Sequence, residues 1–219
     1  MINMKTDETI QLDVERSLYF QPEVDDIPIA VAVEDGVVIL TGKVEQYSQK
    51  EAAQSAARHV SGVRGIVNHI IVAPNGPMVL TDAEIEKAIH QAYQWRWEIP
   101  WKQLRIRVSD GYVTLEGEVG RNFQREAARE AASQLLGVKG VNNKITVRTQ
   151  PDHKADARDV EGALFRNRDI DDDDITVEAL GNTIILRGSV PSLAQKEAAE
   201  KMAWNASGAE HVQNLLEVL

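Results

Sequence analysis

The stretch that decides the fold is residues 35–53, DGVVILTGKVEQYSQKEAA, because the chain repeats its pattern twice more. The pattern returns at residues 110–128 as DGYVTLEGEVGRNFQREAA and at residues 181–199 as GNTIILRGSVPSLAQKEAA. Each copy has a turn dipeptide, an apolar segment that ends in glycine, a valine and a helix start. The copies begin 75 and 71 residues apart, and repetition at a near-constant spacing is typical of tandem units. We therefore predict three domains, at residues 1–75, 76–150 and 151–219.

The residues around the repeated stretch predict the rest of each unit. Ile10, Val14 and Leu18 recur every fourth residue, which is the spacing of one helical face. Residues 29–33 alternate apolar with small side chains, as a half-buried strand does, and the Asp-Gly turn after them is typical of a hairpin. An alanine-rich helix and a third apolar strand follow. The sequence predicts an α+β fold of three tandem α-β-β-α-β repeats, each with two helices packed on one face of a three-stranded mixed sheet. The strand order stays open.

Several helix starts are predicted from capping residues. Expected starts are the N-caps Thr6-Asp7 and Thr81-Asp82 and the capping boxes Ser48–Glu51 and Ser192–Gln195. In the third copy, Asp156 stands where Ile10 and Ile85 stand, so we expect its first helix to begin late.

Three motifs give the chain a resemblance to the BON domain family. They are D-G-x-V-x-L-x-G-x-V, the helix start Q-K-E-A-A, and the strand entry G-V-x-x-V-x-N, and together they span nearly the whole chain. The third copy departs slightly, with Asn182 for the turn glycine and Ala209 for valine. The resemblance implies a non-catalytic module that associates with phospholipid or the cell envelope, in osmotic or envelope stress. Many members of the family are exported to the periplasm.

Composition excludes several other classes of protein. The sequence has no cysteine, so it has neither a disulfide framework nor a thiolate metal site. No apolar run reaches the roughly 20 residues that span a bilayer, so we expect no transmembrane segment. The first residues, MINMKTDETIQLDVE, lack a basic region followed by an apolar stretch. We therefore expect a cytoplasmic protein that attaches peripherally to the membrane, in preference to a periplasmic one.

Charge separates the middle copy from its neighbours. Residues 1–75 carry 6 Lys and Arg against 11 Asp and Glu, a net charge of −5. Residues 76–150 carry 11 against 9, or +2, and residues 151–219 carry 7 against 14, or −7. A total of −10 argues against nucleic-acid binding. The middle copy is the natural candidate for an anionic partner.

The candidate binding site is the segment WRWEIPWK and the strand after it. Its residues are Trp95, Arg96, Trp97, Trp101, Lys102, Arg105 and Arg107. Tryptophan beside arginine and lysine suits the headgroup region of an anionic membrane, and it also suits a hot spot for a protein partner. A third interpretation is that the rings fill a seam between repeats. The sequence therefore leaves open anionic phospholipid, a protein partner and homo-oligomers of the chain.

No motif predicts catalysis, a metal or a cofactor. The acidic run Asp171–Asp174, with Asp169 before it, lacks the ordered ligand spacing and distal glutamate of a calcium loop. The histidines His59, His69, His90, His153 and His211 form no i,i+4 pair. We therefore expect no enzyme, no metal site and no cofactor.

Overall fold

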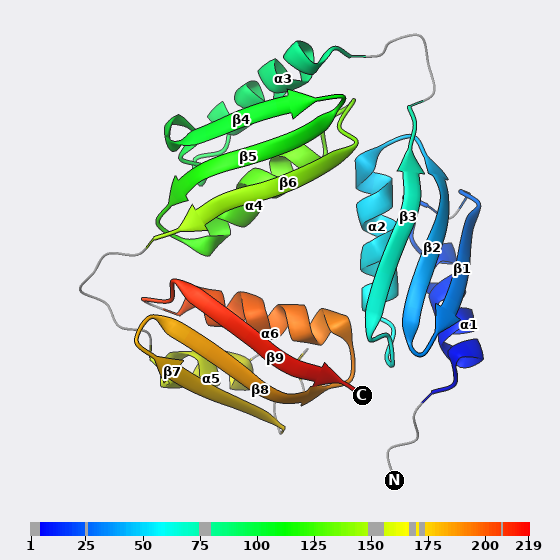
Figure 1. The fold of residues 1–219 in the computed structure, drawn as a ribbon, viewed down its shortest axis with the longest axis vertical. Helices are drawn as coiled ribbons and strands as arrows, with labels where there is room; N and C mark the ends of the chain where they lie inside the picture. The colour runs from blue at the N-terminus through cyan, green and yellow to red at the C-terminus, as the bar shows by residue number, and fades with distance from the viewer. Residues whose placement is uncertain are drawn as a thin grey trace. The chain divides into compact units, whose positions relative to one another are not determined.

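The computed structural model describes residues 5–24, 26–74, 80–148, 156–166, 170, 174–206 and 208–219. Three successive α-β-β-α-β copies appear within them (Figure 1). The predicted boundaries at 75/76 and 150/151 lie outside the described residues.

The elements have the following bounds. The first copy comprises α1 (Asp7–Tyr19), β1 (Ile29–Glu34), β2 (Val37–Val44), α2 (Tyr47–Arg58) and β3 (Gly65–Val72). The second comprises α3 (Asp82–Gln94), a short 3-10 helix η1 (Trp101–Gln103), β4 (Leu104–Ser109), β5 (Tyr112–Val119), α4 (Asn122–Ser133) and β6 (Gly140–Val147). The third comprises α5 (Ala157–Arg166), β7 (Ile175–Leu180), β8 (Thr183–Val190), α6 (Leu193–Asn205) and β9 (His211–Val218). The start of α5 just after Asp156 confirms the late start predicted for that helix.

Each copy builds its own three-stranded mixed sheet, with its second strand in the centre. β4 pairs antiparallel with β5, and β5 pairs parallel with β6; the third sheet repeats this pattern. In the first sheet, the amide of Arg64 donates to Gly36 and that of Ala73 donates to Val44, each over 2.8 Å. The two strands thus begin together and end together, so β3 is also parallel to β2. The α+β prediction is confirmed, and the strand order that the sequence left open is settled.

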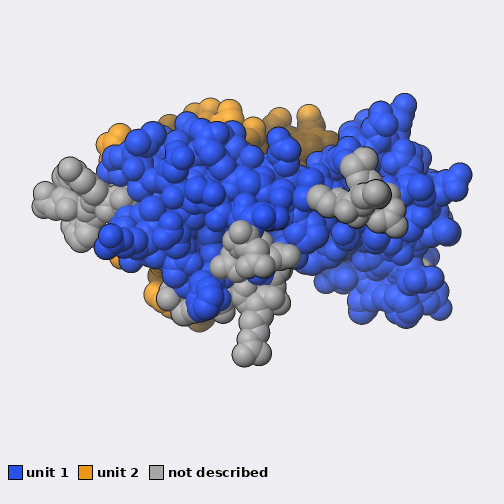
Figure 2. Space-filling model, turned by 90° about the horizontal axis from the view of Figure 1, so that it is seen from below, with its two compact units in different colours: residues 1–43, 51–71, 151–219 blue, residues 44–50, 72–150 orange. Residues whose placement is uncertain are grey.

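The described chain divides into two compact units (Figure 2). One comprises residues 1–43, 51–71 and 151–219, and the other comprises residues 44–50 and 72–150. The second unit holds the whole sheet β4–β5–β6 with α3 and α4, so the candidate site lies within one unit.

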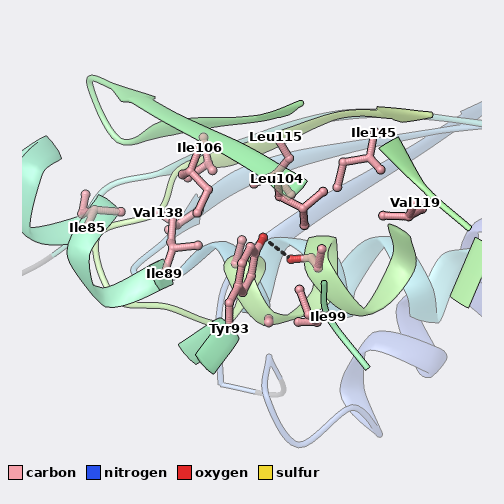
Figure 3. Close-up of a cluster of buried hydrophobic side chains, with 14 residues drawn as sticks. Ile85, Ile89, Tyr93, Ile99, Leu104, Ile106, Leu115, Val119, Val138 and Ile145 are labelled. Carbon is pink, nitrogen blue, oxygen red and sulfur yellow. Dashed lines mark hydrogen bonds between the residues drawn. The ribbon is translucent and has the colours of Figure 1, made fainter. Parts of the chain in front are cut away.

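The core of the second copy lies between its sheet and its two helices (Figure 3). Ile85, Ile89 and Tyr93 form the buried face of α3, as their i,i+4 spacing predicts. The Tyr93 hydroxyl donates a hydrogen bond to the Ala128 carbonyl over 2.8 Å. Burial raises the pKa of Tyr93, so this hydroxyl stays protonated and keeps donating. The bond ties the end of α3 to the middle of α4.

An aspartate clamps the hairpin turn in the first two copies. The Asp82 carboxylate accepts hydrogen bonds from the amides of Asp110 and Gly111, over 2.8 and 2.9 Å. Asp7 accepts from its own hairpin turn in the same way. Asp110 and Gly111 both have positive φ, 52° and 79°, as a two-residue type I′ turn requires. The threonines before these aspartates are the N-caps, as predicted. The corresponding position of the third copy, residue 153, lies outside the described residues.

The glutamine of the Q-K-E-A-A motif caps the second helix in the first two copies. The side-chain oxygen of Gln49 accepts from the amides of residues 45 and 46, each over 3.0 Å. Gln124 accepts from residues 120 and 121 in the same way, over 3.1 Å. The capping box predicted at Ser48 is therefore wrong, because α2 begins at Tyr47 and already includes Ser48. In the third copy Ser192 is the N-cap, as predicted.

The asparagine of the last strand joins that strand to the second helix. Asn143 accepts a hydrogen bond from the amide of Ile145 and donates to the carbonyl of Arg125 in α4, over 3.2 and 3.1 Å. Asn214 makes the same pair of bonds, to Leu216 and to Lys196 of α6. The shared asparagine therefore has a structural role.

The glycine near the end of the second strand is required by close backbone approach. A Cβ on Gly117 would collide with the carbonyl of Gln103, and one on Gly188 would collide with that of Asp174. Gly117 also has a φ of 136°, which side chains rarely adopt. This confirms the close approach that the sequence indicated.

We predict that Tyr93→Phe lowers the free energy of unfolding by about 1 kcal/mol, because the Ala128 carbonyl loses its hydroxyl donor. Urea unfolding followed by tryptophan fluorescence measures this, since three of the four tryptophans lie in the second copy. Tyr112→Phe is the matched control, because Tyr112 is an exposed tyrosine of the same copy. Equal losses in the two variants would contradict the role of the buried hydroxyl.

We predict that Asp82→Ala lowers the free energy of unfolding by about 2 kcal/mol, because two turn amides lose a charged acceptor. Amide hydrogen exchange reports the loss directly: Gly111 should exchange faster, while Gly36 in the first copy should not change. Glu86→Ala on the exposed side of the same helix controls for lost helix charge. Unchanged protection of Gly111 would show that the turn does not depend on the carboxylate.

Candidate functional site

The candidate site lies on the connection between α3 and β4. Trp95 is the C-cap of α3, and the amide of Arg96 donates to the Tyr93 carbonyl over 3.2 Å. Ile99 is buried in the core, and its amide donates to Arg96 over 3.1 Å. This part of the connection is therefore held by backbone hydrogen bonds and by the buried Ile99 side chain.

Trp95 and Trp97 lie almost completely in solvent. Their side chains are 89% and 91% exposed. Most of each indole is apolar, and exposed apolar surface that is contiguous marks interaction sites more often than scattered single side chains do. Neither ring belongs to the core of the second copy.

Trp101 differs from the other two tryptophans. Its ring is half-buried and packs against the core of the second copy. The ammonium of Lys102 lies 5.5 Å from the ring centroid, in cation–π range. The sequence grouped all three rings together, whereas the structure gives Trp101 a packing role.

Arg105 and Arg107 project from the solvent face of β4. Between them in sequence, Ile106 is buried, and Leu104 before them is buried too, so the alternation predicted from the sequence is confirmed. β4 lies at an edge of its sheet, with β5 as its neighbour. The Arg107 guanidinium lies 4.0 Å from the Glu116 carboxylate on β5, both exposed enough for water to screen the pair.

An open cleft of about 530 Å³ lies beside these residues. Its charged lining consists of Glu86 and His90 from α3, Lys102, Arg105 from β4, and Glu116 from β5. The His90 ring lies 4.0 Å from the Glu86 carboxylate. The cleft is a shallow surface of mixed charge, without an enclosed cavity for a small substrate.

Exposed aromatic rings also end the first helix in the other copies, which the sequence analysis missed. Tyr19 and Phe20 at the end of α1 are 69% and 72% exposed, with ring centroids 5.4 Å apart. Phe165 in α5 is 80% exposed. The signal was available in the internal alignment, which places Phe20 opposite Trp95. The copies therefore share an exposed aromatic at this helix end.

The cations on the edge strand occur in the second copy alone. Where β4 has Arg105 and Arg107, β1 has Ala30 and Ala32, and β7 has Thr176 and Glu178. The combination of exposed indole rings and flanking cations is therefore what distinguishes the second copy.

The remaining candidates carry no site within the described part of the chain. Asp169, residues 171–173 of the acidic run and His153 lie outside the described residues. Among the residues that are described, no group of three histidine or acidic side chains is arranged to hold a metal ion. None of the described helices is long and apolar enough to span a bilayer.

Comparison with known proteins gives the family. Among curated proteins, Osmotically-inducible protein Y of Escherichia coli (strain K12) is 27% identical over 147 residues, which are 65% of this chain and 73% of that protein. Two solved chains of CdsD, a structural protein of the type III secretion system of Chlamydia trachomatis, are 13% identical, with TM-scores of 0.25 and 0.26. These alignments cover 95% of this chain and 91% and 96% of the two CdsD chains. That structural likeness is too weak to inform function.

The model of the BON domain family matches residues 6–74, 81–149 and 152–219. Each matched segment contains one hairpin, one glycine-bearing central strand and one crossover helix of the fold described above. The chain therefore belongs to the BON domain family and carries three BON domains in tandem.

Proposed function

We propose that this chain is a non-enzymatic binding protein that attaches peripherally to anionic phospholipid through its second BON domain. The observation that carries the proposal is the exposure of Trp95 and Trp97 on the connection that leads directly into the exposed cations of η1 and β4. We call the exposed part of this surface, Trp95, Trp97, Lys102, Arg105 and Arg107, the Trp/Arg surface.

The two tryptophans supply the apolar part of the interaction. Burying about 100 Å² of each ring at about 25 cal/mol per Å² gives about 2.5 kcal/mol per ring, before ordering costs. Indole rings prefer the headgroup region, where the apolar body and the N–H group are both accommodated. The rings already lie in solvent at a helix end, so no unfolding step precedes their insertion.

The cations supply the preference for anionic lipid. Lys102, Arg105 and Arg107 are exposed within one helix-to-strand segment. Each basic residue near an anionic surface contributes about 1 kcal/mol at physiological salt. The second domain has a net charge of +2 over residues 76–150, whereas both neighbouring domains are acidic. Attraction to an anionic surface is therefore concentrated in the second domain.

The setting that we propose is the osmotic or envelope stress response. The related protein of Escherichia coli is named for osmotic induction. A stress protein that attaches reversibly by two rings and a few cations responds to changes in lipid charge and ionic strength. Location in the cytoplasm stays a prediction from the sequence.

A protein partner at the same surface is the second candidate function. Tryptophan and arginine are the residues most enriched at binding hot spots, and the open edge of β4 beside them offers unpaired backbone groups. In this alternative the chain is an interaction scaffold without lipid affinity. The lipid experiments below separate the two.

We predict that Trp95→Ala/Trp97→Ala weakens binding to vesicles of phosphatidylglycerol and phosphatidylcholine at least tenfold, because both apolar anchors are lost. Vesicle co-sedimentation measures the affinity. The matched control is Tyr19→Ala/Phe20→Ala, which removes two exposed rings at the equivalent helix end of an acidic domain and should change binding less than twofold. Absence of binding by the wild-type chain would refute the lipid function and favour the scaffold.

We predict that Arg105→Gln/Arg107→Gln weakens binding to the same vesicles about tenfold or more and reduces its salt dependence, as loss of two cations near the surface requires. Lys144→Gln/Arg148→Gln is the matched control, since it removes the same charge from β6, the strand at the other edge of the sheet, and from the residue that follows it. Equal effects of the two pairs would assign binding to net charge and not to the Trp/Arg surface.

A further inference from the structure

The solvent face of the first sheet carries more apolar side chains than its equivalents in the other two domains. The outward-facing side chains that make it apolar are Ala30, Ala32, Val37, Ile39, Val67 and Ile71, and we call them the apolar face; Thr41 on β2 and His69 on β3 are polar side chains that face outward among them. Ile71 is 65% exposed and Val67 is 39% exposed. The buried residues of the same strands, such as Val38 and Leu40, point to the helices. The outer side of this sheet therefore carries six apolar side chains in addition to the buried ones on its inner side.

The other two domains show what this face looks like when it is adapted to water. The positions of the apolar face are occupied in the second domain by Arg105, Arg107, Tyr112, Thr114, Asn142 and Thr146. That face carries ion pairs, such as Arg148–Glu118 at 3.4 Å. The third domain has Arg187 4.0 Å from Glu178 on its face. Antiparallel hairpins normally keep one polar, solvated face, so the first domain departs from both the general rule and its own copies.

We infer that the apolar face is a self-association surface, on which a second copy of this chain packs through the same face. A largely apolar sheet face can be matched by another sheet face about 10 Å away, as in a β-sandwich. The apolar face has neither the aromatic rings nor the clustered cations that favour lipid at the second domain. Its acidic and basic side chains are Glu34 and Lys43, on its rim, and Thr41 and His69 are its polar positions further in.

The two rim charges favour a two-fold pairing with antiparallel strands. Glu34 pairs with Val37 at the turn end of the hairpin, whereas Lys43 lies just beyond the Ile29–Gly42 pair at the other end. The two charges are thus about 20 Å apart along the strands. A two-fold axis across the strands brings Glu34 of one copy to the Lys43 end of the other, and the reverse pair forms by symmetry. Neither side chain has an ion pair with a described residue of its own chain.

The size of the face limits the area that a contact between two copies can bury. Three strands about 4.8 Å apart and about 23 Å long give roughly 300 Å² per copy. The two copies together bury roughly 600 Å², which is well below the 1,200–2,000 Å² or so of a stable interface. We therefore expect a weak, reversible dimer that forms with rising concentration.

Sedimentation velocity of the full chain from 5 to 500 µM (order-of-magnitude limits set by the interface size) tests the inference. The wild-type chain should show a reversible dimer. Val67→Asn/Ile71→Thr, which installs the residues of the second domain at these positions, should weaken it at least tenfold. Leu215→Asn, on the face of the third domain, is the matched control and should leave it unchanged. A chain that stays monomeric throughout the range overturns the inference.

A charge swap tests the two-fold geometry. Glu34→Lys alone and Lys43→Glu alone should each weaken the dimer, because each places like charges together. The double variant Glu34→Lys/Lys43→Glu should restore it. Circular dichroism checks that the variants are folded, and surface substitutions of this kind leave the core intact. Failure of the double variant to restore association overturns the two-fold pairing.

Discussion

Each BON domain depends on close packing of an alanine-rich helix against its sheet. The second and third strands are parallel, so the chain must cross from one end of the sheet to the other between them. The crossover helix makes that connection, and its alanines, such as Ala128, Ala131 and Ala132, are completely or almost completely buried. Larger side chains would lift the helix away from the sheet. The cap at the start of the helix, a glutamine in the first two domains and Ser192 in the third, stabilises the helix, and the asparagine of the last strand tethers the helix to the sheet.

In each domain the helices bury one face of the sheet. The residues on the other face of the sheet and at the helix ends are therefore free to vary. The three copies use that freedom differently. The second exposes indole rings and cations, the first has an apolar sheet face, and the third keeps an ion-paired one. Shared residues therefore describe the scaffold, while residues that differ between copies describe what each domain contacts.

The hairpins, the close-approach glycines and the buried faces of the first helices were readable from the sequence, because each depends on local spacing or on one residue type. The roles of Asp82 and Gln124 were harder to read. Asp82 follows a threonine cap in sequence, but its carboxylate reaches a turn 28 residues away. Trp101 was grouped with its neighbours because adjacency in sequence does not show which ring faces the core. The exposed Tyr19 and Phe20 went unnoticed because a helix end gives no periodic signal of burial.

The sequence by itself determined that the chain consists of three α+β units and where the turns and strands of each lie, because repetition and periodicity are properties of the chain alone. It also singled out the basic, tryptophan-rich middle copy. The tertiary structure decided the strand order, the exposure of Trp95 and Trp97, the packing role of Trp101 and the apolarity of an open sheet face in the first domain. These depend on which surfaces the helices cover, and that is set by contacts between residues far apart in the chain.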